Sequence, residues 1–132
     1  MPVRALTSSL VESLAFVHFV VAEHGDVAGL TPDERARIRE TLVRWLALGN
    51  AVTPEAQVDA AMDSVWAHLK NISETTAMEA LKGHVGTIRM ALPEDDHRKA
   101  VLYDMASVSR ADGSVTLGER AIVATVQRML LA

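Results

Sequence analysis

The chain has 132 residues, of which 49% are hydrophobic and 23% charged, the balance of an ordinary globular protein. This length fits a single domain over residues 1–132, and the formal net charge of −4 argues against a nucleic acid as partner. The absence of cysteine excludes disulfide bonds and thiolate metal sites. With no signal-peptide pattern and no transmembrane segment, since the longest apolar stretch (residues 14–22) falls short of roughly 20 residues, we expect a cytoplasmic protein.

Apolar residues recur every three or four positions along six segments, which is the spacing of one face of an α-helix. In chain order these faces cover residues 6–21, 38–46, 58–69, 81–92, 101–108 and 122–130. Aromatic residues are few, and no segment alternates convincingly between apolar and polar side chains, as a strand would. The sequence therefore predicts an all-α fold, a compact bundle of six to seven helices.

The predicted helices are separated by recognisable start and stop signals. Thr31-Pro32 and Thr53-Pro54 each place a capping hydroxyl before a proline at the first helical position. Gly49 follows an apolar run, where a left-handed residue commonly ends a helix. The first helix is almost entirely apolar over residues 14–22, so we expect other helices to surround it.

Two stretches of similar sequence each link an apolar helix to the next one. The later stretch contains Asp112 and Thr116-x-x-Glu119, and the earlier stretch contains Asp26 and Thr31-x-x-Glu34 with one extra residue. Each Thr-x-x-Glu is a capping box, in which the threonine hydroxyl and the glutamate carboxylate accept hydrogen bonds from backbone N–H groups. Capping accounts for the glutamates, but it does not require an aspartate in both copies.

The pattern Ala-Asp-Gly-x-Val-x-x-x-Glu over residues 111–119, with a looser copy some 85 residues earlier, resembles the TerB-like tellurite-resistance family. This resemblance implies an all-helical, pseudo-symmetric bundle associated with bacterial resistance to tellurite and other stresses. It also implies that the two turns meet at one end of the bundle and bind a divalent cation (calcium, magnesium, manganese or zinc). Carried over to this chain, the metal ligands would be Asp26, Glu34, Asp112 and Glu119.

Other polar side chains give no pattern typical of catalysis. His18, on the apolar first helix, is interpreted as a core histidine with a hydrogen-bond acceptor, and His24 as an exposed turn residue, with zinc or manganese binding as its alternative. Trp45 and Trp66 are assigned to the core, with a homodimer contact as the alternative. The methionines on the apolar stripes, Met90 among them, are predicted to fill the core.

The leading functional hypothesis is a non-enzymatic, bacterial stress-response module that acts through protein partners, with no cofactor other than a cation at the acidic turns. The alternative is a helical interaction or oligomerisation domain without metal. A third hypothesis, a carboxylate-metal hydrolase, lacks the Glu-x-x-His pairs that such helical bundles use.

Overall fold

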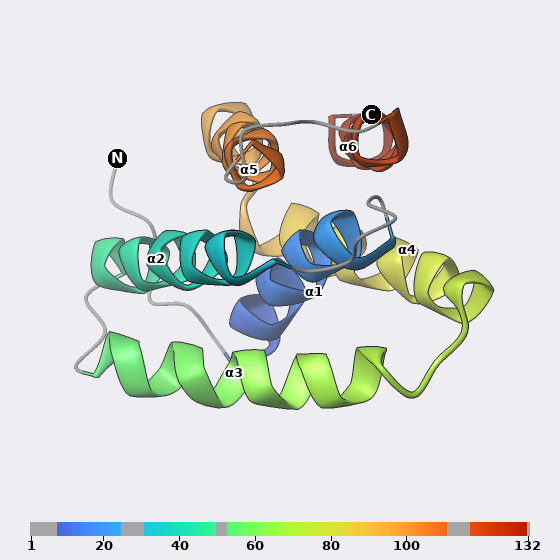
Figure 1. Ribbon diagram of the computed structural model, residues 1–132. Coiled ribbons are helices and arrows are strands. Elements are labelled where there is room, and N and C mark those ends of the chain that lie inside the picture. Colours follow the sequence, from blue (N-terminus) through green and yellow to red (C-terminus); the bar gives the residue numbers. More distant parts are fainter. Residues whose placement is uncertain (1–7, 25–30, 50–52, 111–116, 132) are drawn as a thin grey trace.

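The computed structural model describes residues 8–24, 31–49, 53–110 and 117–131, which form six α-helices and no strand (Figure 1). The helices are α1 (Ser8–His24), α2 (Pro32–Leu48), α3 (Pro54–Leu69), α4 (Glu74–Ala91), α5 (Asp95–Ser109) and α6 (Leu117–Leu130). The predicted all-α bundle is therefore confirmed. Within the described ranges, each helix is too short or too polar to cross a bilayer.

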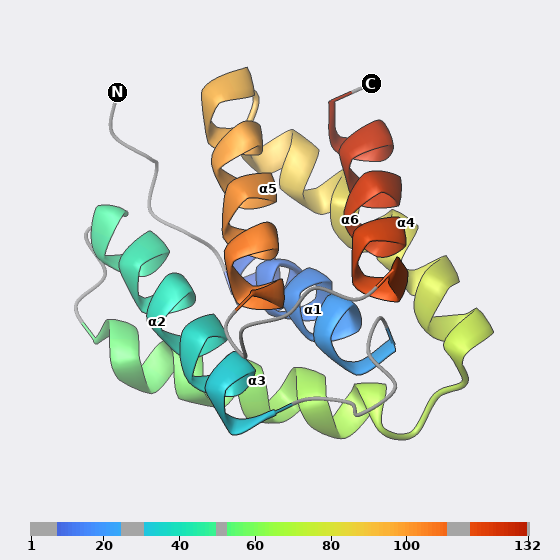
Figure 2. The same ribbon diagram turned by 45° about the horizontal axis from the view of Figure 1, so that its top comes forward.

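Helix α1 runs through the middle of the molecule and contacts each of the other five helices. The pair α2 and α3 lies on one side of α1, and the pair α5 and α6 lies on another, while α4 packs along α1 and α6 (Figures 1 and 2). All side chains from residue 13 to residue 21 are buried, as the apolar sequence of this helix predicted.

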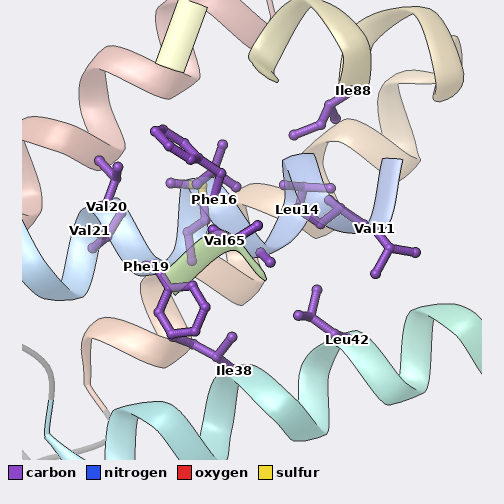
Figure 3. Close-up of a cluster of buried hydrophobic side chains, with 14 of the residues drawn as sticks. Val11, Leu14, Phe16, Phe19, Val20, Val21, Ile38, Leu42, Val65 and Ile88 are labelled. Carbon is purple, nitrogen blue, oxygen red and sulfur yellow. The ribbon is translucent and has the colours of Figure 1, made fainter. Parts of the chain in front are cut away.

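The core is made by side chains that leave α1 in different directions. Leu14, Phe16 and Phe19 are each at most 1% exposed and point toward different neighbouring helices (Figure 3). Burying an aromatic or aliphatic side chain of this size contributes roughly 1.5–3 kcal/mol. Trp45 is buried, as predicted, and Trp66 packs against the core from its edge. The prediction for Met90 is wrong: its side chain is 87% exposed, because it lies on the outer face of α4.

The helix ends follow the sequence signals in part. Thr31 and Glu34 form the predicted capping box at the start of α2. Thr53 occupies the predicted cap position of α3, but its side chain makes no capping hydrogen bond. Gly49 ends α2 with a φ of −86°, so the predicted left-handed residue is absent at this position.

Helix α4 is continuous through Gly83 and Gly86, and it turns sharply into α5. Arg98 of α5 holds this corner, because its guanidinium donates to the carbonyl oxygens of Arg89 (2.8 Å) and Leu92 (2.7 Å). Arg89 lies in the last turn of α4 and Leu92 is its C-cap, where carbonyl oxygens lack hydrogen-bond donors within the helix. Asp95 and Asp96 lie in the first turn of α5, where the helix dipole favours negative charge.

Candidate functional site

The capping box at the start of α2 fixes the side chain of Glu34. The Glu34 backbone N–H donates to Oγ1 of Thr31 (3.1 Å), and the Thr31 N–H donates to Oε1 of Glu34 (3.0 Å). A glutamate in a capping box usually remains solvated at the helix surface, yet Glu34 is 0% exposed. Capping therefore explains the orientation of this carboxyl group and leaves its burial unexplained.

A second buried glutamate, Glu119, lies next to Glu34. Glu119, in the first turn of α6, is also 0% exposed, and its side chain lies close enough to that of Glu34 to affect its pKa. The pKa of Glu34 is raised to about 7, chiefly by burial; the Thr31 hydrogen bonds lower it, and the Glu119 side chain adds a smaller rise. The structure thus brings together two of the four predicted metal ligands. We call Glu34 and Glu119 the acidic pair.

The other two predicted ligands, Asp26 and Asp112, lie outside the described residues, as does Thr116 of the second capping box. Within the described ranges, no group of three or more histidine, aspartate or glutamate side chains is arranged to hold a metal ion. The acidic pair supplies two carboxylates, and the ligand roles of Asp26 and Asp112 stay predictions.

Two carboxyl groups buried side by side need a proton or a cation between them. Like charges in contact cannot both remain ionised away from water at low cost, so one carboxyl holds a proton or a bound cation neutralises the pair. Oε2 of Glu34 is buried and finds no hydrogen-bond partner among the described residues. This arrangement fits a site where a cation replaces a proton.

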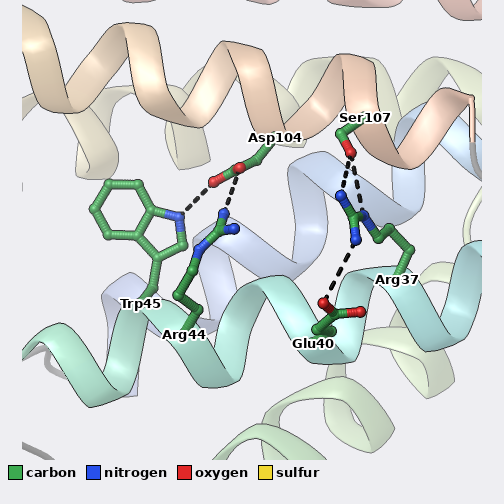
Figure 4. Close-up of polar contacts among 6 residues, drawn as sticks. All are labelled: Arg37, Glu40, Arg44, Trp45, Asp104 and Ser107. Atoms are coloured by element: carbon green, nitrogen blue, oxygen red, sulfur yellow. Dashed lines mark hydrogen bonds and ion pairs between the residues drawn. The ribbon is translucent and has the colours of Figure 1, made fainter.

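A second polar cluster, which sequence reasoning missed, joins α2 to α5 (Figure 4). The buried Asp104 carboxylate accepts hydrogen bonds from Nη2 of Arg44 (2.5 Å) and from Nε1 of Trp45 (2.8 Å). One helical turn along α5, Ser107 Oγ accepts from Nη2 (2.8 Å) and Nε (3.1 Å) of Arg37. These contacts join residues about 60–70 positions apart, so no local sequence pattern indicates them.

His18 lies in the core, as predicted, but without the predicted acceptor. Neither ring nitrogen has a hydrogen-bond partner among the described residues, and the side chain is 0% exposed. Burial lowers the pKa of His18 to about 4, with a smaller opposing effect from Asp104 and a smaller lowering effect from Arg44. The imidazole is therefore neutral near pH 7. The side chain of the other candidate, His24, lies outside the described part of the structure.

A further histidine contact joins α1 to α4. Oγ of Ser13 and Nδ1 of His84 are 2.8 Å apart, and the His84 ring stacks on Phe16 with 4.2 Å between ring centroids. Burial lowers the pKa of His84, and the nearby His68 lowers it further, while Glu12 raises it. Ser13 is itself buried, so this pair is a fixed contact between helices.

The fold and its site define an all-helical bundle in which two glutamates from different helix N-termini meet in the interior. No family model, curated protein or solved structure matches the chain.

Proposed function

We propose that this chain is a non-enzymatic stress-response module, similar to the TerB-like proteins of tellurite resistance, that acts through protein–protein contacts. In this proposal Glu34 and Glu119 bind a divalent cation together with Asp26 and Asp112 of the preceding turns. The observation that supports the cation site is the burial of the acidic pair, whose side chains lie close enough for one to raise the pKa of the other. Two segments of similar sequence, far apart in the chain, contribute one carboxyl group each to the same place.

The chemistry of the acidic pair favours a hard cation. Carboxylate oxygens are the ligands that calcium, magnesium and manganese prefer, whereas zinc sites usually include histidine or cysteine. Two carboxylates offer at most four oxygens, and calcium takes six to eight. The two aspartates and the backbone carbonyls of the same turns are the candidates for the remaining ligands.

Thermal unfolding with and without each ion tests the cation site. A ligand that binds only the folded chain stabilises it by roughly 2.7 kcal/mol at a hundred times its dissociation constant. We expect calcium, magnesium or manganese to raise the unfolding temperature of the natural chain, and we expect Glu34→Gln and Glu119→Gln to abolish this rise. Asp33→Asn is the matched control, because Asp33 precedes Glu34 in the same helical turn but is exposed.

The outcomes separate the functional hypotheses. If no ion changes the unfolding temperature, the cation site is refuted and a helical interaction domain without metal remains. If Asp33→Asn loses the ion effect as fully as Glu34→Gln does, the effect is nonspecific screening. Unchanged tellurite tolerance after deletion of the gene would contradict the stress-response role.

A further inference from the structure

Glu12 is the one exposed side chain on α1 between Leu10 and Val21. Every other side chain in this range is buried because neighbouring helices cover it. Glu12 is exposed because α3 and α4 both pack on α1 but leave a gap over this residue. Two hollows of about 210 and 310 Å³ lie beside it, the first against α3 and the second against α4. We call the two hollows with Glu12 between them the Glu12 groove.

The walls of the Glu12 groove are made of small or uncharged side chains. Gln57 and Ala60 of α3 line the first hollow, and Ala80, Gly83 and Thr87 of α4 line the second. A Cβ atom added at Gly83 would meet no atom within 4 Å, so the space above this glycine is open. Small side chains of this kind let the backbone of a further helix approach closely.

Among the described residues that line this groove, Glu12 has no oppositely charged partner. No lysine or arginine of the described ranges forms an ion pair with it. His84 lines the second hollow, and burial lowers its pKa, which favours the neutral imidazole. Its contacts with Ser13 and Phe16 hold the ring in place. Among the described residues, the groove therefore has an uncharged wall and one negative charge in its floor.

We propose that the Glu12 groove is the docking site for an amphipathic helix of a partner protein that carries a central lysine or arginine. The basic side chain pairs with the Glu12 carboxylate, and aliphatic side chains three or four positions before and after it enter the two hollows. Residues at this spacing lie on one face of a helix, which is how helices generally bind in grooves. The net charge of −4 also favours the approach of a basic partner.

Selection from a displayed library of amphipathic helical peptides, with the full chain as the target, tests this proposal. We expect lysine or arginine to be enriched at one position, with aliphatic residues three or four positions to either side. Glu12→Gln should weaken a selected peptide about tenfold, the effect of losing one partly desolvated charge pair. Gly83→Leu should abolish binding by filling the second hollow.

Two matched variants serve as controls. Gly86→Leu makes the same change in the same helix at a position that lines neither hollow, and a Cβ there also meets nothing within 4 Å. Glu79→Gln removes an exposed carboxylate of α4 that lines neither hollow. Both should bind the selected peptide as the natural chain does. Circular dichroism melts establish that each variant is folded, and Glu12→Gln remains informative even if Gly83→Leu fails to fold.

Several outcomes would overturn the proposal. The selection could enrich no basic residue at a fixed position, or it could enrich acidic residues. The selected peptides could also bind Gly83→Leu as tightly as the natural chain. Self-association of the natural chain that Gly83→Leu abolishes would show a second copy as the occupant instead. This inference deepens the proposed interaction function and rests on it, yet the two fail separately. An ion effect in a chain that selects no basic helix would refute the groove alone, and the reverse would refute the cation site alone.

Discussion

Glu34 binds its proton more tightly in the folded chain than in the unfolded one. Its pKa is raised from 4.5 to about 7, chiefly by burial and to a smaller extent by Glu119. A raised pKa stabilises the fold at low pH, and this contribution is lost as the pH rises from 4.5 through about 7. We therefore expect Glu34→Gln, which remains neutral, to lose less stability than the natural chain over this interval. Urea unfolding at a series of pH values, without divalent ions, measures the difference.

The control for this prediction is Glu40→Gln on the same helix, since Glu40 is exposed and forms only a surface pair with Arg37. Its pH profile should run parallel to that of the natural chain. Identical profiles for Glu34→Gln and the natural chain would show that the acidic pair holds no proton in this interval.

His18 changes the stability of the fold with pH in the opposite direction to Glu34, over nearly the same pH range. Burial lowers its pKa from 6.5 to about 4, so the unfolded chain takes up a proton before the folded chain does. The stabilising contribution is complete above pH 6.5 and is lost as the pH falls through about 4, a change of about 3 kcal/mol. We expect His18→Leu to lose less stability on acidification, as measured by urea unfolding. If the free energy of unfolding falls equally with pH in the natural chain and in His18→Leu, the buried imidazole is not neutral in this pH range.

The contact between α2 and α5 depends on Asp104. Asp104→Ala leaves the buried Trp45 N–H without its acceptor, and an unsatisfied buried group of this kind costs about 1–3 kcal/mol. Asp59→Ala is the comparison, because the Arg39–Asp59 pair (2.8 Å) lies at the surface, where solvent screens it. We expect chemical denaturation to show a clear loss of stability for the first variant and little change for the second. Equal losses would mean that burial of the carboxylate does not matter.

Helix α4 carries two glycines whose side of the helix is open. Because a Cβ at Gly83 meets nothing within 4 Å, Gly83→Ala should fit without strain and improve helix propensity. The expected gain in the free energy of unfolding is up to about 1 kcal/mol, seen as a higher denaturation midpoint with an unchanged slope. A loss of stability would indicate that the position is more crowded than the structure shows.

The helices themselves could be predicted from the sequence, because the apolar spacing and the Thr31-Pro32 start signal are local properties of the chain. The environments of single side chains were harder to predict from the sequence. The Arg44 side chain is 55% exposed, as expected among the charged residues of α2, but its guanidinium also pairs with the buried Asp104. Glu34 fitted a capping box fully, so nothing in the local pattern indicated its burial. Both environments depend on side chains of a helix that is distant in the sequence, and the apolar periodicity does not indicate such contacts.

At the scale of the whole molecule, the central position of α1 was predictable because an apolar helix without a polar face must be surrounded. That Glu34 and Glu119 would lie near each other was expected only from the resemblance of the two segments to the TerB-like family. Glu34 and Glu119 lie together, while the metal-ligand role of all four acidic residues stays a prediction. The similarity could not indicate the gap over Glu12, because that gap depends on the angle at which α3 and α4 cross α1.

Because α1 contacts all five other helices, damage to it should destabilise the entire bundle. Leu14 is 0% exposed, and its replacement by alanine is expected to cost about 2–5 kcal/mol through lost burial and the cavity left behind. Leu48→Ala removes the same atoms from a side chain that is 54% exposed and should change stability little. Amide hydrogen exchange should show protection falling together in all six helices of Leu14→Ala, because the best-protected amides exchange through global unfolding. Loss of protection confined to α1 would mean that the outer helices hold together without it.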